Sequence, residues 1–344
     1  MFSRSGREGP EPGKQQAQTA SATSDGLPPI RDGALLLTAA YLYYAEDRSQ
    51  EEIARRIGVS RSTVSRLLAE ARRTGIVRIE VTALPADGSL EQHLAAQLGI
   101  ERVYAAPGIA DENDPGPILS DAAGKALIDS GLTADDALLV SWGRATWSIS
   151  HTELPSLPGA VVLPAVGGLN DDQPWFQTNE IARRLAASIH GRARLLHAPA
   201  LPSEDLRRSL LADASIRSVI SRWDDSTAIL VGIGAWPKTR PHEAPTALPV
   251  EKAALRHAVG DVAGRLFDAN GDPVHSGADS ALLAVTREQL TRIPKRIGIA
   301  AGIRKADAII AAARSGLINV LVTDIVTAST LRTRSVSGRP GSRP

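Results

Sequence analysis

One segment, Gln50–Gly75, constrains the fold most, because its small and apolar residues recur at the spacing of a helix-turn-helix. Ile53 begins an apolar stripe that repeats four residues later, and Ala54 provides the small side chain required where two helices cross. Gly58 falls where the first helix must end in the left-handed conformation, which glycine adopts without strain. Ser60 is a typical N-cap of a second helix, so the segment predicts two short helices joined by a tight turn.

The outward face of the second predicted helix is basic and polar, as expected of a helix that enters the major groove of DNA. Residues 53–78 contain seven arginines and a single acid, Glu70, whereas the whole 344-residue chain has a net charge of +1. Arg pairs bidentately with guanine, and Ser and Thr bind bases or phosphates less selectively. The predicted DNA contacts are Ser60, Arg61, Ser62, Thr63, Ser65 and Arg66 on the helix, with Arg55, Arg56, Arg72 and Arg73 at the phosphates.

Composition divides the remaining chain. Residues 1–30 are rich in Gly, Pro, Ser and Gln and have almost no large apolar side chains, so they are predicted to form a disordered tail. Residues 31–82 are predicted to form the DNA-binding domain, in which the alternating run Ile76–Val81 is an edge strand, or wing. The remainder is predicted to be a linker at 83–88, an effector and oligomerisation domain at 89–332 and a disordered tail at 333–344.

The large domain is predicted to be α/β, because short continuous apolar runs alternate with amphipathic helical patterns. Such runs indicate parallel strands that are buried on both faces. We therefore predict a Rossmann-like open parallel sheet, interrupted by a hairpin with Ala269-Asn270-Gly271 at its turn. The expected strands are Ala137–Trp142, Ala160–Pro164, Arg194–His197, Ala228–Gly232, Arg296–Ala300 and Val320–Thr323, and the expected helices include Glu180–His190 and Lys305–Ser315.

Glycines and polar residues follow several of these strands, at the edge where open parallel sheets bind ligands. Glycine lets the backbone approach an anion, and the start of a following helix offers free N–H donors. A plain turn explains any one such loop equally well, but several on one edge favour a small anionic metabolite. The residues in these loops are Gly143, Arg144, Thr146, Gly167, Gly168, Gly234 and Lys305.

Two further polar positions each have two interpretations. The polar residues Gln177, Thr178 and Asn179 precede a predicted helix. They either recognise ligand hydroxyl groups or cap the helix, a role that suits Thr178 or Asn179. Asp261 lies between two glycines, where it binds a polyol or serves as a turn residue.

The sequence lacks the signals of several other classes of protein. It has no cysteine, which excludes disulfides and thiol catalysis. Its histidines lack the spacing of a metal site, and neither GxSxG nor a P-loop occurs, so no metal, cofactor or catalytic residue is predicted. Without a signal peptide or an apolar run that spans a membrane, we expect a cytoplasmic protein with no membrane contact.

Taken in order, these motifs resemble the SorC family of sugar-binding transcriptional regulators, which are sometimes grouped with DeoR-type proteins. The resemblance implies operator DNA and a sugar, sugar-phosphate or polyol effector as partners, and a homotetramer or homodimer. It also implies the fold shared by ribose-phosphate isomerase and glucosamine-phosphate deaminase. The matching segments are SQEEIARRIGVSRSTVSRLLAEARRTGIVRI, LLVSWGRAT, NEIARRLA, LLHAPA, LVGIGA, VGDVAGRLFDANGDPV, AAGIRKADAI and GLINVLVTD.

The resemblance also assigns effector contacts. The loop that holds the effector phosphate corresponds to Gly143, Arg144 and Thr146, and the remaining positions to Gly167, Gly168, Gln177, Asn179, Asp261 and Lys305. This chain departs from the family at two positions. Val166 stands where many members have Arg, and Ala235 stands where others have a polar residue, so possible polar contacts are lost.

Three functions stay open on these residues. The first is a DNA-binding transcriptional regulator of carbohydrate genes that a sugar-like effector controls. The second is a DNA-binding protein whose α/β domain only oligomerises, so that no small molecule alters its DNA affinity. The third is an isomerase- or deaminase-like enzyme, for which Asp261 and Asp324 are the only acid–base candidates and neither has a clear partner.

Overall fold

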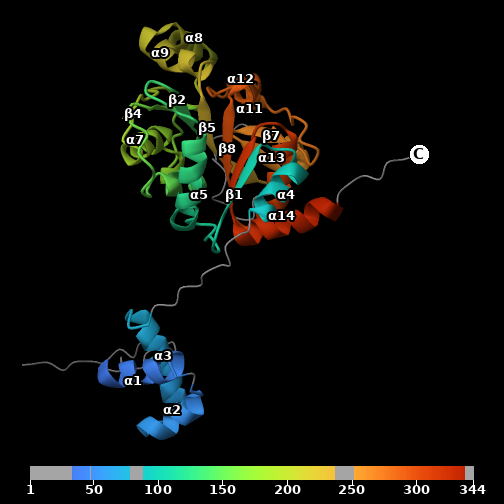
Figure 1. Ribbon diagram of the computed structural model, residues 1–344. Helices are drawn as coiled ribbons and strands as arrows, with labels where there is room; N and C mark the ends of the chain where they lie inside the picture. Colours follow the sequence, from blue (N-terminus) through green and yellow to red (C-terminus); the bar gives the residue numbers. More distant parts are fainter. Residues whose placement is uncertain (1–32, 47, 78–87, 237–251, 338–344) are drawn as a thin grey trace, which may run out of the picture. The chain divides into compact units, whose positions relative to one another are not determined.

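The computed structural model describes residues 33–46, 48–77, 88–236 and 252–337. The chain divides into two compact units, Met1–Glu80 and Val81–Pro344 (Figure 1). The expected tail at 1–30, nearly all of the expected linker and the wing from Arg78 onward lie outside the described residues. In the described ranges, no helix combines the length and apolarity needed to cross a membrane.

The described part of the N-terminal unit is a helix-turn-helix, as predicted, preceded by a further helix: α1 (Gly33–Tyr44), α2 (Gln50–Ile57) and α3 (Arg61–Arg73). Gly58 ends α2 with a φ of +71°, the conformation that its position predicts. Leucine, isoleucine, valine and alanine side chains from the three helices form one core. Its buried members are Leu36, Ala39, Ala40, Leu42, Ile53, Ala54, Val64, Leu67, Leu68 and Ala71.

A parallel sheet organises the second unit, as predicted. Its strand order is β1-β9-β8-β5-β2-β3-β4, and all neighbours in that order pair in parallel. The strands are β1 (Arg102–Ala106), β2 (Ala137–Val140), β3 (Val161–Pro164), β4 (Arg192–Ala193), β5 (Ala228–Ala235), β8 (Lys295–Ile299) and β9 (Val320–Asp324).

Two strand predictions need correction. The strand expected at Arg194–His197 is instead the two-residue β4, which pairs with β3 at the edge of the sheet. Gly234 is not in a loop after a strand, because β5 continues through it to Ala235. The strand β1, which pairs with β9, was not predicted.

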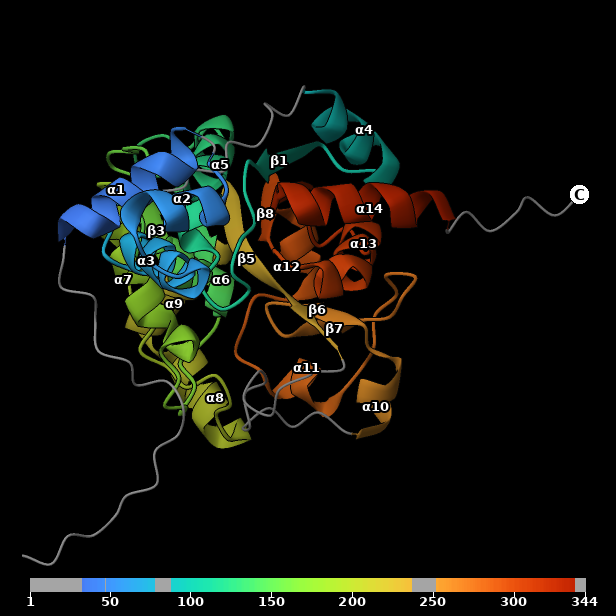
Figure 2. The same ribbon diagram turned by 90° about the horizontal axis from the view of Figure 1, so that it is seen from below.

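Helices cover both faces of the sheet (Figure 2). On one face, α4 (Ser89–Leu98), α13 (Ala306–Arg314) and α14 (Ile325–Ser337) contribute to a core that also takes Leu139 of β2. On the other face, α5 (Gly116–Asp129), α6 (Arg144–Ile149) and α7 (Thr178–Ser188) contribute to a core that takes Leu138. Since adjacent strand residues enter opposite cores, the strands are buried on both sides, which explains their continuous apolar sequences. The helix α14 continues beyond the predicted domain end at residue 332.

The other elements of the second unit come between these strands in the sequence. Two antiparallel strands, β6 (Gly260–Val262) and β7 (Arg265–Phe267), form a hairpin that pairs with the end of β5. Its two-residue turn has positive φ at Ala263 and Gly264. The predicted turn around Asn270 is confirmed, since Phe267 and Pro273 form an antiparallel bridge. The other helices are η1 (Pro174–Phe176), α8 (Glu204–Ala212), α9 (Ala214–Ile220), η2 (Ser221–Trp223), α10 (Lys252–His257), α11 (Gly277–Ala281), α12 (Arg287–Arg292) and η3 (Ile303–Lys305).

Candidate functional site

The start of α3 is fixed by a cluster of hydroxyl groups. Ser60 caps the helix, as predicted: its Oγ accepts a hydrogen bond from the Thr63 N–H at 3.1 Å. The same Oγ lies 2.8 Å from the hydroxyl oxygens of both Ser62 and Thr63. These three hydroxyl groups therefore bond to one another at the start of α3.

The predicted DNA-contacting arginines are all exposed. Arg61 lies 3.7 Å from the Glu51 carboxylate, and Arg73 pairs with Glu70. Among the residues that the structure describes, no carboxylate lies within 4.0 Å of Arg55, Arg66 or Arg72. Exposed guanidiniums on a helix whose opposite face is buried suit a polyanion, since each can exchange water or a weak ion pair for a phosphate.

In the second unit, the turn after β2 lies against β5. A Cβ added to Gly143 would lie 3.8 Å from the Cα of Gly232. The Gly143 N–H donates to the Trp175 carbonyl at 2.9 Å, so this amide is not available to a ligand. The buried Thr146 hydroxyl lies 2.9 Å from the Gly143 carbonyl and 3.0 Å from that of Ser141. Thr146 therefore shapes the turn, whereas its neighbour Arg144 is half-buried.

The glycine pair after β3 has a packing role that the sequence did not indicate. The N–H groups of Gly167 and Gly168 donate at 2.9 Å to the carbonyls of Leu283 and Ala198. A Cβ on Gly167 would lie 2.7 Å from the carbonyl of Pro199. Both amides are therefore already bonded within the protein and are not free to donate to an anion.

The polar residues at the start of α7 also differ from expectation. Neither Thr178 nor Asn179 caps the helix, because the N-cap position is Gln177 and no side chain caps it. Asn179 donates from Nδ2 to the Leu196 carbonyl at 3.1 Å and accepts the Leu196 N–H at 2.9 Å. Gln177 donates to the Asp171 carbonyl at 2.8 Å. Both amides hold loop backbone in place.

The end of β5 brings together three predicted effector contacts from distant parts of the sequence. Gly234 pairs with Asp261 in the β5–β6 ladder. Lys305 donates from Nζ to the Ile233 carbonyl at 3.1 Å. The Asp261 carboxylate accepts hydrogen bonds from the Trp236 indole at 3.2 Å and the Gly264 N–H at 3.3 Å. The ammonium of Lys305 and the residue Asp261 therefore meet two consecutive residues of β5, Ile233 and Gly234.

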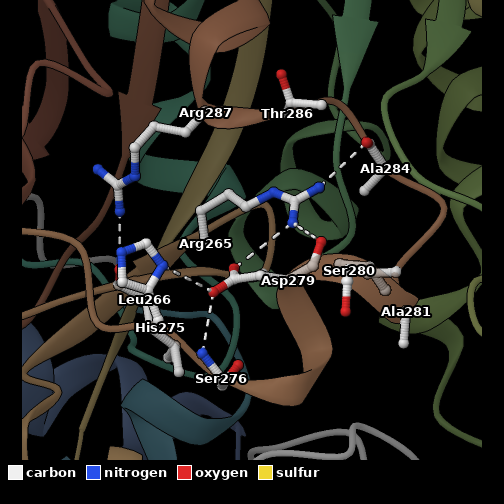
Figure 3. A network of polar contacts seen from close by, with 12 residues as sticks. Arg265, Leu266, His275, Ser276, Asp279, Ser280, Ala281, Ala284, Thr286 and Arg287 are labelled. Carbon is white, nitrogen blue, oxygen red and sulfur yellow. Dashed lines mark hydrogen bonds and ion pairs between the residues drawn. The ribbon is translucent and has the colours of Figure 1, made fainter.

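A buried arginine that the sequence analysis missed holds the hairpin carrying Asp261 (Figure 3). Arg265 is only 5% exposed, and its guanidinium donates to the carbonyls of Asp279, Ala284 and Val285 at 2.9–3.1 Å. Burial lowers the pKa of Arg265, while the Asp279 carboxylate, 3.6 Å away, acts in the opposite direction. Arg287 adds a second tie by donating to the Leu266 carbonyl at 2.8 Å. The hairpin is thereby fixed to the segment that precedes β8.

The two predicted acid–base candidates hold structural positions. Asp324 is 1% exposed and accepts the Thr327 N–H at 2.7 Å and the Ala110 N–H at 2.9 Å, so it secures the start of α14. Asp261 holds the hairpin turn and the Trp236 indole. Within the described residues, no three His, Asp or Glu side chains gather as a metal site would require.

Comparisons with known proteins agree with this division into two units. A family model described as "Putative sugar-binding domain" matches residues 85–332, and a MarR family model matches residues 36–88. The sorbitol operon regulator of Klebsiella pneumoniae is 30% identical over 86% of this chain and 97% of that protein. The transcriptional regulator LsrR of Escherichia coli K12 is 32% identical over 85% of this chain and 92% of that protein. The crystal structure of full-length SorC from K. pneumoniae aligns with a TM-score of 0.63 and 29% identity, over 87% of this chain and 98% of that one.

Proposed function

The chain belongs to the SorC family of sugar-binding transcriptional regulators, and on that premise we propose that a phosphorylated sugar or polyol controls its binding to operator DNA. DNA binds at α3, where Arg61 and Arg66 read bases, with Arg55, Arg56, Arg72 and Arg73 at the phosphates. The effector binds at the edge of the sheet formed by the ends of β2, β5 and β8.

The position of Lys305 carries the effector proposal. Its Nζ donates a hydrogen bond to the Ile233 carbonyl at 3.1 Å, which places a cation at the end of β5. Asp261, on the neighbouring strand, supplies acceptors for polyol hydroxyl groups. Lys305 and Arg144 therefore bind the anionic part of one small molecule, and Asp261 binds its hydroxylated part.

The two departures from the family pattern reduce the number of residues that can contact the effector phosphate. Val166 is fully buried and bridges Ala284, while Ala235 pairs with Gly260. Neither position supplies a polar side chain. The phosphate contacts are therefore assigned to Arg144 and Lys305.

The protein acts as a homodimer or homotetramer in the cytoplasm, where its operator is, and it has no catalytic activity. Two helix-turn-helix units are needed to read two half-sites, which favours an even number of copies. The uncharged helix α1 leaves Leu37 and Tyr41 each 59% exposed, one turn apart, which is an apolar surface that a second copy would cover.

The test is operator binding, using DNA from the protein's own promoter region, with and without sugars, polyols and their phosphates. We expect one phosphorylated compound to shift the operator affinity. Tight DNA binding whose affinity none of these compounds changes would favour an α/β domain that only assembles the oligomer. Turnover of a sugar phosphate would instead favour an enzyme.

A further inference from the structure

Two arginines at the edge of the sheet face the same turn of the loop between β1 and α5, residues 107–115. Arg144 donates from Nη1 to Asn113 Oδ1 at 3.3 Å, and its guanidinium lies 4.7 Å from the centre of the Trp175 ring. Arg304 forms an ion pair with the Glu112 carboxylate. Because Glu112 and Asn113 are consecutive, one loop turn meets guanidiniums that come from the ends of β2 and β8.

The loop is anchored on both sides of these contacts. Before them, the Ala110 N–H donates to the buried Asp324 carboxylate at 2.9 Å. After them, the Ser148 hydroxyl bonds to Asp114 and accepts the Gly116 N–H at 2.6 Å. The middle of the loop is therefore held over the edge of the sheet by its flanks, independently of the two arginines.

The Glu112 side chain fills the space over the turn that carries Arg304 and Lys305. A Cβ added to Gly302, which has a φ of +109°, would lie 2.7 Å from Glu112 Cγ. The side chain of Glu112 therefore lies where a side chain at residue 302 would otherwise be. The Glu112 carboxylate thus fills the space over the β8–α13 turn and lies beside the Arg304 guanidinium, a cation that an anionic ligand could bind.

We propose that Glu112 is an internal substitute for the anionic group of the effector: a phosphate monoester displaces it and takes Arg304 and Arg144 as ligands. This inference rests on the proposed function and deepens it, by assigning Arg304 to the site and Glu112 to the setting of its affinity. An exposed carboxylate–guanidinium pair contributes little net stability, so a dianion can replace it. A phosphate also accepts bidentate hydrogen bonds from arginine.

The test compares inorganic phosphate binding by the full-length wild type and Glu112→Gln, measured by titration calorimetry. Removing the competing carboxylate should tighten phosphate binding about two- to fivefold. Neutral sorbitol should show no such gain. Glu101→Gln is the matched control, because Glu101 pairs with Lys295 at the opposite end of β1 and β8 and makes the same change in charge.

A second variant separates displacement from a general charge effect. Arg304→Gln should weaken phosphate binding, and Glu112→Gln should give no gain when combined with it. The proposal is overturned if Glu112→Gln binds phosphate no tighter than the wild type, or if Glu101→Gln gains as much. Should no phosphorylated compound shift operator affinity while Glu112→Gln still tightens phosphate binding, this site stands and the proposed control of DNA binding fails.

Discussion

Arg265 ties the hairpin beside the proposed effector site to three backbone carbonyls. Its guanidinium is buried and donates to three carbonyls, so Arg265→Ala leaves these acceptors unpaired and removes the arginine that faces the Asp279 carboxylate. We expect the free energy of unfolding to fall by about 3 kcal/mol. All five tryptophans lie in the second unit, so denaturant unfolding followed by tryptophan fluorescence measures this change.

The control for this variant is Arg208→Ala, since Arg208 pairs with Asp205 on the exposed surface of α8. An exposed pair contributes about 0–1 kcal/mol, so this control should change stability little. Equal losses in the two variants would contradict the role assigned to Arg265.

Arg66 is the residue that tests base reading most directly. It is exposed on α3, and no acidic partner lies near it among the described residues. Arg66→Ala should weaken operator binding by about 1–3 kcal/mol if its guanidinium pairs with guanine. Arg183→Ala, which removes an arginine paired with Glu180 on α7, is the control in a DNA-binding titration. Unchanged operator affinity in Arg66→Ala would rule out this contact.

Residue types in the sequence predicted where polar groups gather but not what they bind. Asn179 was a candidate for ligand hydroxyl groups, yet both ends of its amide are bonded to Leu196. Thr146 likewise bonds to backbone carbonyls. An amide or hydroxyl can satisfy a backbone group as readily as a ligand, so only the positions of the partners decide between the two.

At the scale of elements, α2 begins with a capping box: the Ser49 hydroxyl accepts the Glu52 N–H, and the Glu52 carboxylate accepts the Ser49 N–H. This capping box gives the N-terminal unit a pH dependence. The Ser49 N–H, and then its hydroxyl group, hold the pKa of Glu52 below its ordinary value. A lowered pKa means that this stabilisation is present above the ordinary pKa and is lost as the pH falls through the lowered one. Amide hydrogen exchange in α2, corrected for intrinsic rates, should therefore show less protection near pH 3 than at pH 7.

Glu52→Gln keeps a side chain that can accept the same hydrogen bond but does not titrate. Its α2 protection should depend less on pH than that of the wild type. If the two proteins lose protection equally on acidification, Glu52 is not the group responsible.

The sequence predicted elements well where one strong local signal exists. Continuous apolar runs marked β2, β3, β5, β8 and β9, because strands buried on both faces need them. The run Arg102–Ala106 of β1 contains one β-branched residue and ends in two alanines, which are depleted in strands, so its signal is weaker. The hairpin β6–β7 was not predicted, because its strands are short and because its turn includes Ala263. A positive φ is not expected of alanine, so the residue type gave no turn signal.

At the scale of the whole molecule, control of DNA binding by an effector requires that the two units communicate. Control of DNA binding by an effector is a coupling free energy, so the effector must bind the DNA-bound and DNA-free forms with different affinities. The order of motifs along the chain predicted both units. It could not identify the effector, because the site that we propose takes its side chains from β2, β5 and β8 and from the loop after β1.

The most direct test is a reciprocal measurement with the effector found in the operator assay. Operator affinity is measured with and without saturating effector, and effector affinity with and without saturating operator. We expect both affinities to change by the same factor, about 5- to 150-fold. An operator affinity that saturating effector leaves unchanged would contradict the claim that a sugar-like ligand controls DNA binding.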